Sequence, residues 1–388
     1  MPAASEVRHG ELLAYREEFP LVARTTYLNT CSLGALSRRS RARLDAVLDQ
    51  WDGLGARAWY DHWLAELAAL RDDLGWTIGV PGSEVALAPN VSAALAVVAS
   101  AVDPLHRAGR PKVITTALDF PTVGHQWLAR ARLGVEVVVL PSPDGMTVPL
   151  EEFERAIDER TALVATAHVY FTTGAVQDVA AVGSLCHERG ALLLIDAYQA
   201  TGLLPTDAGG LGPDFYVSGT LKWLFGGPGT AFLWVRPDLR EALDPTTTGW
   251  FSSARQFDFD VASLDFAPDG RKFELGTPSV PSAAIARGGL EIVREIGIER
   301  LYERTIDLSA LTIRLCREAD LRVRDVPGDR RAGIVTIAVD DPKSVVDALA
   351  ERGIIVDYRP GIVRLSPAFY NTPGEVATAV EAIAKLVR

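Results

Sequence analysis

Residues 191–235 read ALLLIDAYQATGLLPTDAGGLGPDFYVSGTLKWLFGGPGTAFLWV. This stretch holds three short apolar runs, ALLLIDA, DFYVSG and TAFLWV, which are separated by segments rich in glycine or proline. Short runs rich in leucine, valine and aromatic residues are typical of buried strands. Similar runs precede them at 85–89, 112–116, 135–140 and 162–168, with helical patterns at 91–102 and 180–190. Strands that alternate with helices predict an α/β fold with a mostly parallel, mixed sheet.

The length of the chain and a change of pattern after residue 280 predict two domains. A chain of 388 residues is too long for one ordinary hydrophobic core. A long helical segment follows at 282–319, and short strands then alternate with helices to the C-terminus. We therefore expect a large domain at 26–280 and a small C-terminal α+β domain at 281–388. An N-terminal arm, residues 1–25, is expected to pack with the small domain.

The composition favours a soluble cytoplasmic protein and does not exclude small anionic ligands. The net charge of −11 argues against nucleic-acid partners, because phosphate backbones attract basic surfaces. Three widely separated cysteines, Cys31, Cys186 and Cys316, indicate neither a disulfide framework nor a zinc site. The N-terminal segment carries charges where a signal peptide has an apolar core. No apolar run reaches the roughly 20 residues that cross a bilayer, so no membrane partner is expected.

Lys222 is the first candidate catalytic residue, because it stands within the apolar and small-residue run VSGTLKWLFGGPG. Burial disfavours the ammonium form and lowers the pKa of a lysine, which makes its amine a nucleophile. The ordinary alternative is a lysine whose stem lies along the surface while its head reaches water. Asp196 ends the apolar strand upstream, where an α/β sheet binds ligands, although an aspartate there can also cap a helix. Pyridoxal phosphate needs such a pair, a lysine for a Schiff base and an acid beside its pyridine nitrogen.

A phosphate site is predicted where a strand ends at Asn90 and a helix begins with Val91, Ser92 and Ala93. The free N–H groups of a helix N-terminus attract phosphate, although the same pattern also marks a plain helix cap. Ser218, just before the lysine, can add a hydroxyl.

Phe120, in DFPTVGH, is a candidate for stacking on the cofactor ring, and a buried core phenylalanine is the alternative. Gly226, Gly227 and Gly229 follow the lysine rather than precede it, so they match neither nucleotide-binding glycine motif. These glycines are expected to let the backbone turn tightly between Lys222 and the next strand.

Five blocks of sequence resemble the class V aminotransferase family of fold-type I pyridoxal-phosphate enzymes, and within it the kynureninase-like branch. The blocks are IDAYQATG (195–202), DFYVSGTLKWLFGGPGTAFLWVRPDL (214–239), TGWF (248–251), FELGTPSVP (273–281) and IIVDYRPGIVRLSPAFYNT (354–372). They follow the family's order from about residue 27 to the C-terminus. The resemblance implies a pyridoxal 5'-phosphate cofactor, an amino acid or amine substrate, and a homodimer with its active sites at the interface.

The resemblance also implies a role for each matching residue. Lys222 corresponds to the Schiff-base lysine, Asp196 to the partner of the pyridine nitrogen, and Gln199 to a polar residue near the phenolic oxygen. Arg364 corresponds to the arginine that binds the substrate's α-carboxylate, which suits a planar guanidinium, although an exposed strand arginine is the alternative. The contacts to the phosphate and the ring correspond to Val91, Ser92, Ala93, Phe120 and Ser218, with Trp250 and Thr277 often contributed by the second subunit. Asn29 is expected on the substrate side, with Tyr27, Trp59, His62, His125 and Tyr170 as further candidates for a side-chain pocket.

Two departures separate the chain from a kynureninase proper. Leu221 replaces a tyrosine immediately before the lysine, and Thr277 replaces an asparagine that helps to read the aromatic substrate. A cysteine desulfurase would need a mobile cysteine ahead of Arg364, whereas Cys316 lies in the long helical segment. Both kynurenine and persulfide chemistry are therefore disfavoured.

The chain is thus predicted to be an aminotransferase or a C–S or Cβ lyase for a specialised amino acid, which replaces Lys222 on the cofactor. Lys222 then moves the Cα proton as general base and general acid. A kynureninase-type hydrolase is the alternative reaction. A binding protein without catalysis on the same fold is the alternative of another class, and the retained pair of Lys222 and Asp196 argues against it.

Overall fold

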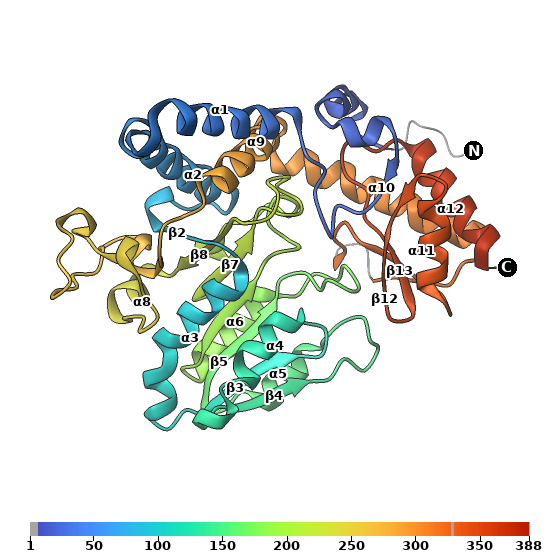
Figure 1. Cartoon of the computed structure of the whole chain (residues 1–388). Coiled ribbons are helices and arrows are strands. Elements are labelled where there is room, and N and C mark those ends of the chain that lie inside the picture. The colour runs from blue at the N-terminus through green and yellow to red at the C-terminus, as the bar shows by residue number, and fades with distance from the viewer. Residues whose placement is uncertain (1–6, 327–329, 388) are drawn as a thin grey trace.

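The computed structural model describes residues 7–326 and 330–387, and its central feature is a mixed sheet (Figure 1). Seven strands of these residues form the sheet in the order β2–β8–β7–β6–β5–β3–β4. β8 is antiparallel to both of its neighbours, whereas the strands from β7 to β4 are parallel to one another. The bounds are β2 (Val85–Ala88), β3 (Lys112–Thr116), β4 (Glu136–Leu140), β5 (Thr161–Ala167), β6 (Leu192–Asp196), β7 (Phe215–Gly219) and β8 (Ala231–Val235). Each strand overlaps one of the apolar runs predicted from the sequence, with β5 beginning one residue before its run, so the α/β fold is confirmed.

The two faces of the sheet bury different side chains, because successive residues of a strand point to opposite faces. Leu193, Ile195 and Tyr216 pack in the hydrophobic cluster that also holds α2, α5, α6 and α9. Leu194 and Phe215 pack in the cluster that holds α3 and α4. The bounds are α2 (Leu64–Thr77), α3 (Val91–Arg107), α4 (Pro121–Leu128), α5 (Leu150–Ala156), α6 (Val179–Glu188) and α9 (Val280–Ile296). Helices therefore cover both faces, which leaves the carboxyl edge of the sheet for a site.

The predicted helical segment 282–319 consists of two helices instead of one. α9 ends before Gly297, and α10 (Ile298–Glu318) begins after it. Gly297 has a φ of 87°, which residues with a Cβ rarely adopt, so the glycine turns the chain at this point. α9 packs against α1 (Arg38–Leu54) and α2, whereas α10 packs against the C-terminal elements.

The C-terminal part holds an antiparallel sheet in the order β12–β13–β10–β9, with helices α10, α11 and α12 packed around it (Figure 1). The N-terminal segment lies against these helices, because Arg8 pairs with Asp307 of α10 and Arg16 pairs with Glu375 of α12. The division into an arm and two domains at residues 25 and 280 stays a prediction. The bounds are β9 (Val323–Arg324), β10 (Val335–Ala338), α11 (Pro342–Ala350), β12 (Asp357–Arg359), β13 (Ile362–Leu365) and α12 (Pro373–Val387).

Short elements complete the described part of the chain. β1 (Thr26–Tyr27) pairs in parallel with β11 (Ile354–Ile355). The short helices are η2 (Gly10–Glu18), η3 (Pro20–Ala23), η4 (Gly55–Arg57), η5 (Trp59–Trp63), η6 (Gly82–Glu84), η7 (Ala131–Leu133), α7 (Ala208–Leu211), α8 (Pro237–Ala242), η8 (Trp250–Ser252), η9 (Gln256–Asp258) and η10 (Gly270–Phe273). Over residues 7–326 and 330–387, none of the helices has the length and apolar character needed to cross a membrane.

Candidate active site

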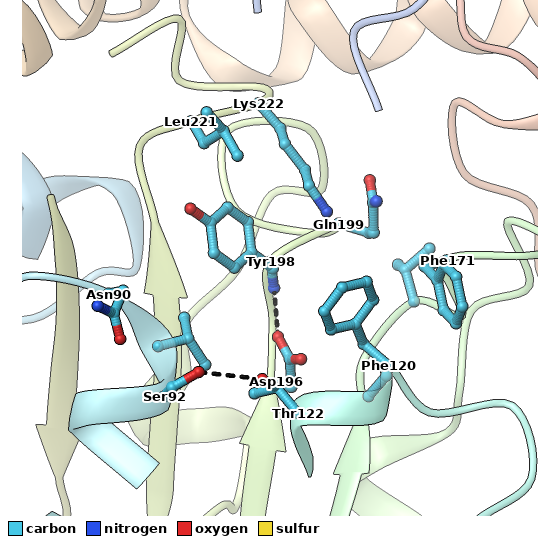
Figure 2. A pocket seen from close by; sticks show the side chains of 13 residues that line it. Asn90, Ser92, Phe120, Thr122, Phe171, Asp196, Tyr198, Gln199, Leu221 and Lys222 are labelled. Atoms are coloured by element: carbon cyan, nitrogen blue, oxygen red, sulfur yellow. Dashed lines mark hydrogen bonds between the residues drawn. The ribbon is translucent and has the colours of Figure 1, made fainter. Parts of the chain in front are cut away.

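A pocket opens at the carboxyl edge of the central sheet, where β5 and β6 end and α3 begins (Figure 2). Ligands of α/β sheets bind at this edge, since parallel strands direct their carboxyl ends to the same side. The lining residues come from the ends of strands, from the N-termini of α3 and α4, and from the segment after β7. They are Asn90, Val91, Ser92, Phe120, Thr122, Ala167, Val169, Phe171, Asp196, Tyr198, Gln199, Leu221 and Lys222.

Lys222 reaches this pocket from the turn that follows β7 (Figure 2). Its Nζ lies 4.7 Å from the ring centroid of Tyr198 and 5.8 Å from that of Phe120, so the ammonium stands beside both rings. Burial lowers the pKa of Lys222 to about 8, and the charges of Arg364 and Arg359 act in the same direction. The lysine therefore has a head that faces the pocket and an amine that loses its proton more readily than an exposed lysine.

The glycines after Lys222 shape the turn that carries it. Gly227 and Gly229 have φ values of 65° and 99°, which favour glycine. A Cβ on Gly226 would lie 2.6 Å from the Cβ of Thr220 and 2.8 Å from the Cα of Ala286. The tight turn expected from the sequence is therefore present, and at Gly226 it lies close to Thr220 and to the backbone of α9.

Asp196 ends β6 and turns its carboxylate into the pocket, below Lys222 in Figure 2. It is 5% exposed, and its Oδ1 accepts a hydrogen bond from the Tyr198 N–H at 2.9 Å. Burial raises the pKa of this carboxyl, and the Tyr198 N–H and the charge of Lys222 act against that shift. No described helix begins at Asp196, so a helix cap does not explain this aspartate.

The N-terminus of α3 forms another wall. Asn90 caps the helix, because its Oδ1 accepts from the Ala93 N–H at 2.9 Å. The hydroxyls of Ser92 and Thr122 lie 3.0 Å apart, and both residues line the pocket. Unpaired N–H groups of the first helical turn and two hydroxyls thus face one end of the pocket. Ser218 is different, since it lies outside the lining and its hydroxyl donates to the Ala197 carbonyl at 3.3 Å.

Aromatic rings form the sides of the pocket. Phe120 is 41% exposed, so it is not the buried core phenylalanine of the alternative interpretation. Its ring meets that of Phe171 edge to face, with 5.1 Å between the centroids. Tyr198 lies to the left of Lys222 Nζ in Figure 2, and Phe120 lies below it. Aromatic rings that line a pocket can stack on a flat ligand.

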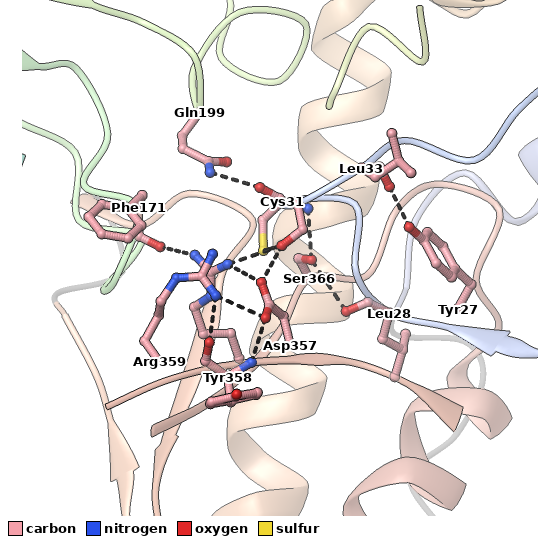
Figure 3. A network of polar contacts seen from close by, with 12 residues as sticks. Tyr27, Leu28, Cys31, Leu33, Phe171, Gln199, Asp357, Tyr358, Arg359 and Ser366 are labelled. Atoms are coloured by element: carbon pink, nitrogen blue, oxygen red, sulfur yellow. Dashed lines mark hydrogen bonds and ion pairs between the residues drawn. The ribbon is translucent and has the colours of Figure 1, made fainter. Parts of the chain in front are cut away.

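Gln199 connects the pocket to a polar network beside it (Figure 3). Its Nε2 donates to the Cys31 carbonyl at 2.9 Å, and its Oε1 accepts from the Trp223 indole at 3.0 Å. The amide is therefore held in one orientation. The network continues through Ser32 to the arginine predicted to bind a carboxylate.

Arg364, on β13, is 1% exposed, which excludes the exposed strand arginine of the alternative interpretation. It donates through Nη1 to the Phe171 carbonyl at 2.5 Å and through Nη2 to the Ser32 hydroxyl at 3.1 Å. Nη2 also pairs with Asp357 at 2.5 Å. Arg364 is not among the residues that line the Lys222 pocket, but its guanidinium carbon lies 5.8 Å from the ring centroid of Phe171, which does.

Trp250 and Thr277 lie together, but away from the Lys222 pocket. The indole of Trp250 donates to the Thr277 hydroxyl at 3.3 Å, and neither residue lines the pocket. The structure of one chain thus does not bring them to Lys222.

The other candidates for a side-chain pocket do not line it either. Tyr27 donates its hydroxyl to the Leu33 carbonyl, Tyr170 donates to Gln177, and Trp59 packs on Trp63. His62 and His125 are exposed, and Asn29 pairs through its backbone with Ser366.

Sequence reasoning missed five lining residues, Thr122, Ala167, Val169, Phe171 and Tyr198. Tyr198 and Thr122 lie within the quoted motifs IDAYQATG and DFPTVGH, so their position in the chain was a usable signal. Phe171 follows β5 without any motif, and only the packing of the strand ends reveals it.

These residues fit pyridoxal phosphate. The buried carboxylate of Asp196 lacks a second donor among the described residues, as a partner for a protonated ring nitrogen requires. The aromatic lining suits a planar group, the start of α3 suits a phosphate, and Lys222 stands where a covalent bond to the cofactor could form. Asp196, Phe120, Ser92 and Lys222 are therefore the residues that could hold the cofactor.

Comparisons with known proteins agree with this chemistry. The model of the family "Aminotransferase class-V" matches residues 49–376. An uncharacterized aminotransferase, YcbU, of Bacillus subtilis (strain 168) is 34% identical over 373 residues, which cover 95% of this chain and 96% of that protein. A kynureninase of Pseudomonas fluorescens is 30% identical over 394 residues, which cover 97% and 92%.

Solved structures share the fold at lower identity. A cysteine desulfurase from Thermococcus onnurineus NA1 superimposes with a TM-score of 0.86 at 21% identity, over 96% of this chain and 97% of that one. The cystine C–S lyase C-DES superimposes with a TM-score of 0.85 at 22% identity, over 94% and 99%. At these identities the likeness shows the fold, and the family rests on the sequence matches. The chain therefore belongs to the aminotransferase class-V family, as its motifs predicted, and is a pyridoxal-phosphate-dependent enzyme of fold type I.

Proposed function

We propose that the enzyme is an aminotransferase or lyase that acts on an α-amino acid at the Lys222 pocket. One observation carries this proposal: Lys222 Nζ lies 4.7 Å from the ring centroid of Tyr198 and 5.8 Å from that of Phe120, on the side of the pocket opposite the buried carboxylate of Asp196 (Figure 2). A lysine and an acid on opposite sides of one pocket match this cofactor. The Schiff base with the lysine forms at one end of its ring, and the pyridine nitrogen, which needs the acid, lies at the other end.

Each contact to the cofactor has a residue of suitable chemistry. Lys222 would hold it covalently, and Asp196 would keep a proton on its pyridine nitrogen. Phe120 offers a ring face, and Gln199 an amide for the phenolic oxygen. The phosphate is assigned to the start of α3 at Val91, Ser92 and Ala93, while the contacts from Ser218, Trp250 and Thr277 stay predictions.

Proton transfer is assigned to Lys222. Pyridoxal phosphate, when bound, supplies an electron sink that stabilises negative charge at the substrate Cα. Lys222 takes the proton from Cα and can return it to a neighbouring carbon. The pKa of about 8 suits this role, because the amine then exists in both protonation states near neutral pH.

Substrate binding is assigned to Arg364. Its buried guanidinium is the cation expected to receive the α-carboxylate, and Asn29 is the further candidate on this side. Val169, Phe171 and Leu221 give the pocket an apolar wall, which excludes water from the amine of Lys222.

A kynureninase-type hydrolase is the second candidate reaction. Its support is the 30% identical kynureninase of Pseudomonas fluorescens. Against it stands Leu221, which lines the pocket with an apolar side chain at the position directly before the lysine. We therefore rank transamination or elimination first.

A homodimer is proposed as the active form, in the cytoplasm. Exposed apolar side chains gather on the segment from Trp250 to Leu264, where the fully exposed Val261 and the 69% exposed Phe259 are prominent. Apolar groups of this density on one surface favour a protein partner, and a second copy would cover them. Trp250 also carries the indole predicted to reach the second subunit's cofactor.

Borohydride reduction tests the cofactor site. The purified protein is expected to be yellow, and reduction followed by peptide mapping should place the label on Lys222. Lys272 is the matched control, because it is also buried but pairs with Asp244 and the Arg240 carbonyl. A label on Lys272, or on no lysine, would contradict the site.

Products then separate the reactions. The enzyme is incubated with a panel of amino acids, and the products are identified. A keto acid with aminated cofactor indicates transamination, pyruvate with ammonia indicates β-elimination, and alanine with an aromatic acid indicates the kynureninase reaction. Binding of amino acids without any product would favour the non-catalytic alternative.

A further inference from the structure

A cluster of two arginines and one carboxylate stands beside the pocket, and the proposed function leaves its carboxylate unexplained (Figure 3). Arg364 Nη2 donates to Asp357 Oδ2 at 2.5 Å, and Arg359 Nη1 donates to Asp357 Oδ1 at 2.9 Å. The hydroxyl of Ser32 also donates to Oδ2. The side chains of Arg364 and Asp357 are 1% and 18% exposed, so water weakens their interaction little.

The cluster lacks a partner. Its two arginines and one aspartate leave one positive charge in excess. The Nε of Arg364 is buried without a hydrogen-bond partner among the described residues. Buried polar groups in proteins are normally paired, so this unpaired donor indicates a ligand that accepts a hydrogen bond.

Phe171 joins this cluster to the Lys222 pocket. The guanidinium carbons of Arg364 and Arg359 lie 5.8 and 5.9 Å from the centroid of its ring. Phe171 also lines the pocket, so a ligand beside Lys222 can direct a carboxylate past this ring toward Arg364.

One substrate carboxylate neutralises the excess positive charge of the cluster. A second carboxylate on the same substrate would find no further positive charge there. Lys222 and Asp196 are the charged residues among those that line the pocket, and the proposed function assigns both to the cofactor. The wall near Phe171 is apolar, formed by Ala167 and Val169. A charged substrate side chain would lose its hydration there without gaining a partner.

We propose that Asp357 is a specificity-determining residue, which limits the site to α-amino acids with one carboxylate and an uncharged side chain. The inference rests on the proposed function, because it takes Arg364 as the ligand of the α-carboxylate. Asp357 neutralises one of the two arginines and leaves a single positive charge for the substrate. It also holds the guanidinium of Arg364 against Phe171.

Calorimetric titration of the holoenzyme tests this specificity. L-leucine, L-asparagine and L-aspartate have side chains of the same branched shape, and they differ in polarity and charge. The wild-type enzyme is expected to bind L-leucine at least about tenfold more tightly than L-aspartate. The affinity for L-asparagine should lie closer to that for L-leucine than to that for L-aspartate. In Asp357→Asn this ratio should fall at least about tenfold, because the freed arginine charge can receive the second carboxylate.

Asp325→Asn is the matched control. Asp325 is 19% exposed and accepts from Arg331 at 2.5 Å and from Arg317 at 2.6 Å, yet it lies outside the pocket lining. This variant should keep the wild-type ratio. If Asp357→Asn does not fold, Arg359→Gln tests the charge balance by removing one positive charge from the cluster. The preference for L-leucine over L-aspartate should then rise above that of the wild type.

Four results would overturn the inference. They are equal affinity of the wild type for L-leucine and L-aspartate, an unchanged ratio in a folded Asp357→Asn, an equal change in Asp325→Asn, and no binding of any of the three amino acids. Failure of the proposed function has a different signature, namely no chromophore with pyridoxal phosphate. A protein that forms the chromophore but gives one of the four results overturns the inference alone.

Discussion

Asp119 is expected to hold together the edge of the sheet that carries the pocket, and its replacement by asparagine tests this. Asp119 is 9% exposed and precedes Phe120. Its Oδ2 accepts from the Thr115 hydroxyl at 2.8 Å and from the Thr116 N–H at 2.7 Å. Its Oδ1 accepts from the Thr166 hydroxyl at 3.0 Å and from the Ala167 N–H at 2.7 Å. The carboxylate thus ties the end of β3 to the end of β5.

The size of the effect follows from these four hydrogen bonds. Asparagine has one oxygen and one NH₂ group where Asp119 has two oxygens. Whichever way the amide points, the N–H of Thr116 or of Ala167 faces a donor, whereas a threonine hydroxyl can rotate. An unpaired buried N–H costs about 1–3 kcal/mol, and loss of a charged acceptor adds about 1 kcal/mol. We expect the free energy of unfolding to fall by about 2–4 kcal/mol.

Scanning calorimetry measures the change as a shift in Tm. A loss of 1 kcal/mol lowers the Tm of a larger domain by about 2–4 °C, so Asp119→Asn should melt at least about 4 °C below the wild type. Asp260→Asn is the control, since the fully exposed Asp260 accepts from the Ala262 N–H at 2.8 Å and the Ser263 hydroxyl at 2.6 Å. Its stability should change by no more than about 0.5 kcal/mol. Equal Tm values for the two variants would refute the reasoning about buried acceptors.

Three further predictions concern the site and its supports. Lys222 of the cofactor-free protein should bind pyridoxal phosphate covalently at a rate that rises with pH around a midpoint of about 8, because the neutral amine is the nucleophile. Stopped-flow absorbance measures this rate, and a midpoint near 10.5 would contradict the effect of burial on the pKa of Lys222. Arg71→Met removes the partner that contacts the buried carboxylate of Glu274 at 2.8 Å, and should lower the free energy of unfolding by about 3–5 kcal/mol in a melting experiment. Adding Glu274→Gln to this variant should restore most of that loss, because the buried charge without a partner is then removed. Gly226→Ala should release pyridoxal phosphate on gel filtration, because the new Cβ would stand 2.8 Å from the backbone of α9. Gly124→Ala is the control, since its new Cβ meets nothing within 4 Å and this variant should retain the cofactor.

The sequence predicted the central sheet well because its signals are local. Each strand is a short apolar run bounded by turn residues, and β5 to β8 are buried on both faces, so their composition alone distinguishes them. The helical segment at 282–319 was predicted less well. Gly297 stands in an otherwise helical pattern, and its φ of 87° depends on how α9 and α10 pack.

The candidate site was predicted in part. Lys222, Asp196, Phe120, Ser92 and Gln199 line one pocket, and each stands at or just after the end of a strand. Position at a strand end can be inferred from the sequence, because the carboxyl ends of parallel strands meet at one edge.

Ser218 shows where this inference stops. It also lies near the end of a strand, yet its hydroxyl points to the Ala197 carbonyl. The direction of a side chain depends on the register between β6 and β7, which strand periodicity does not give.

The amino-acid sequence by itself determined which segments form the sheet, which residues end its strands and which cofactor chemistry they support. The pairing of Asp357 with Arg364, and the position of the Phe171 ring beside Arg364 and in the lining of the Lys222 pocket, were decided only by the tertiary structure. Ser32, Phe171 and Arg364 are far apart in the chain and meet through the packing of three separate segments. A charge balance of this kind depends on distances across the fold, and local sequence patterns hold no record of those distances.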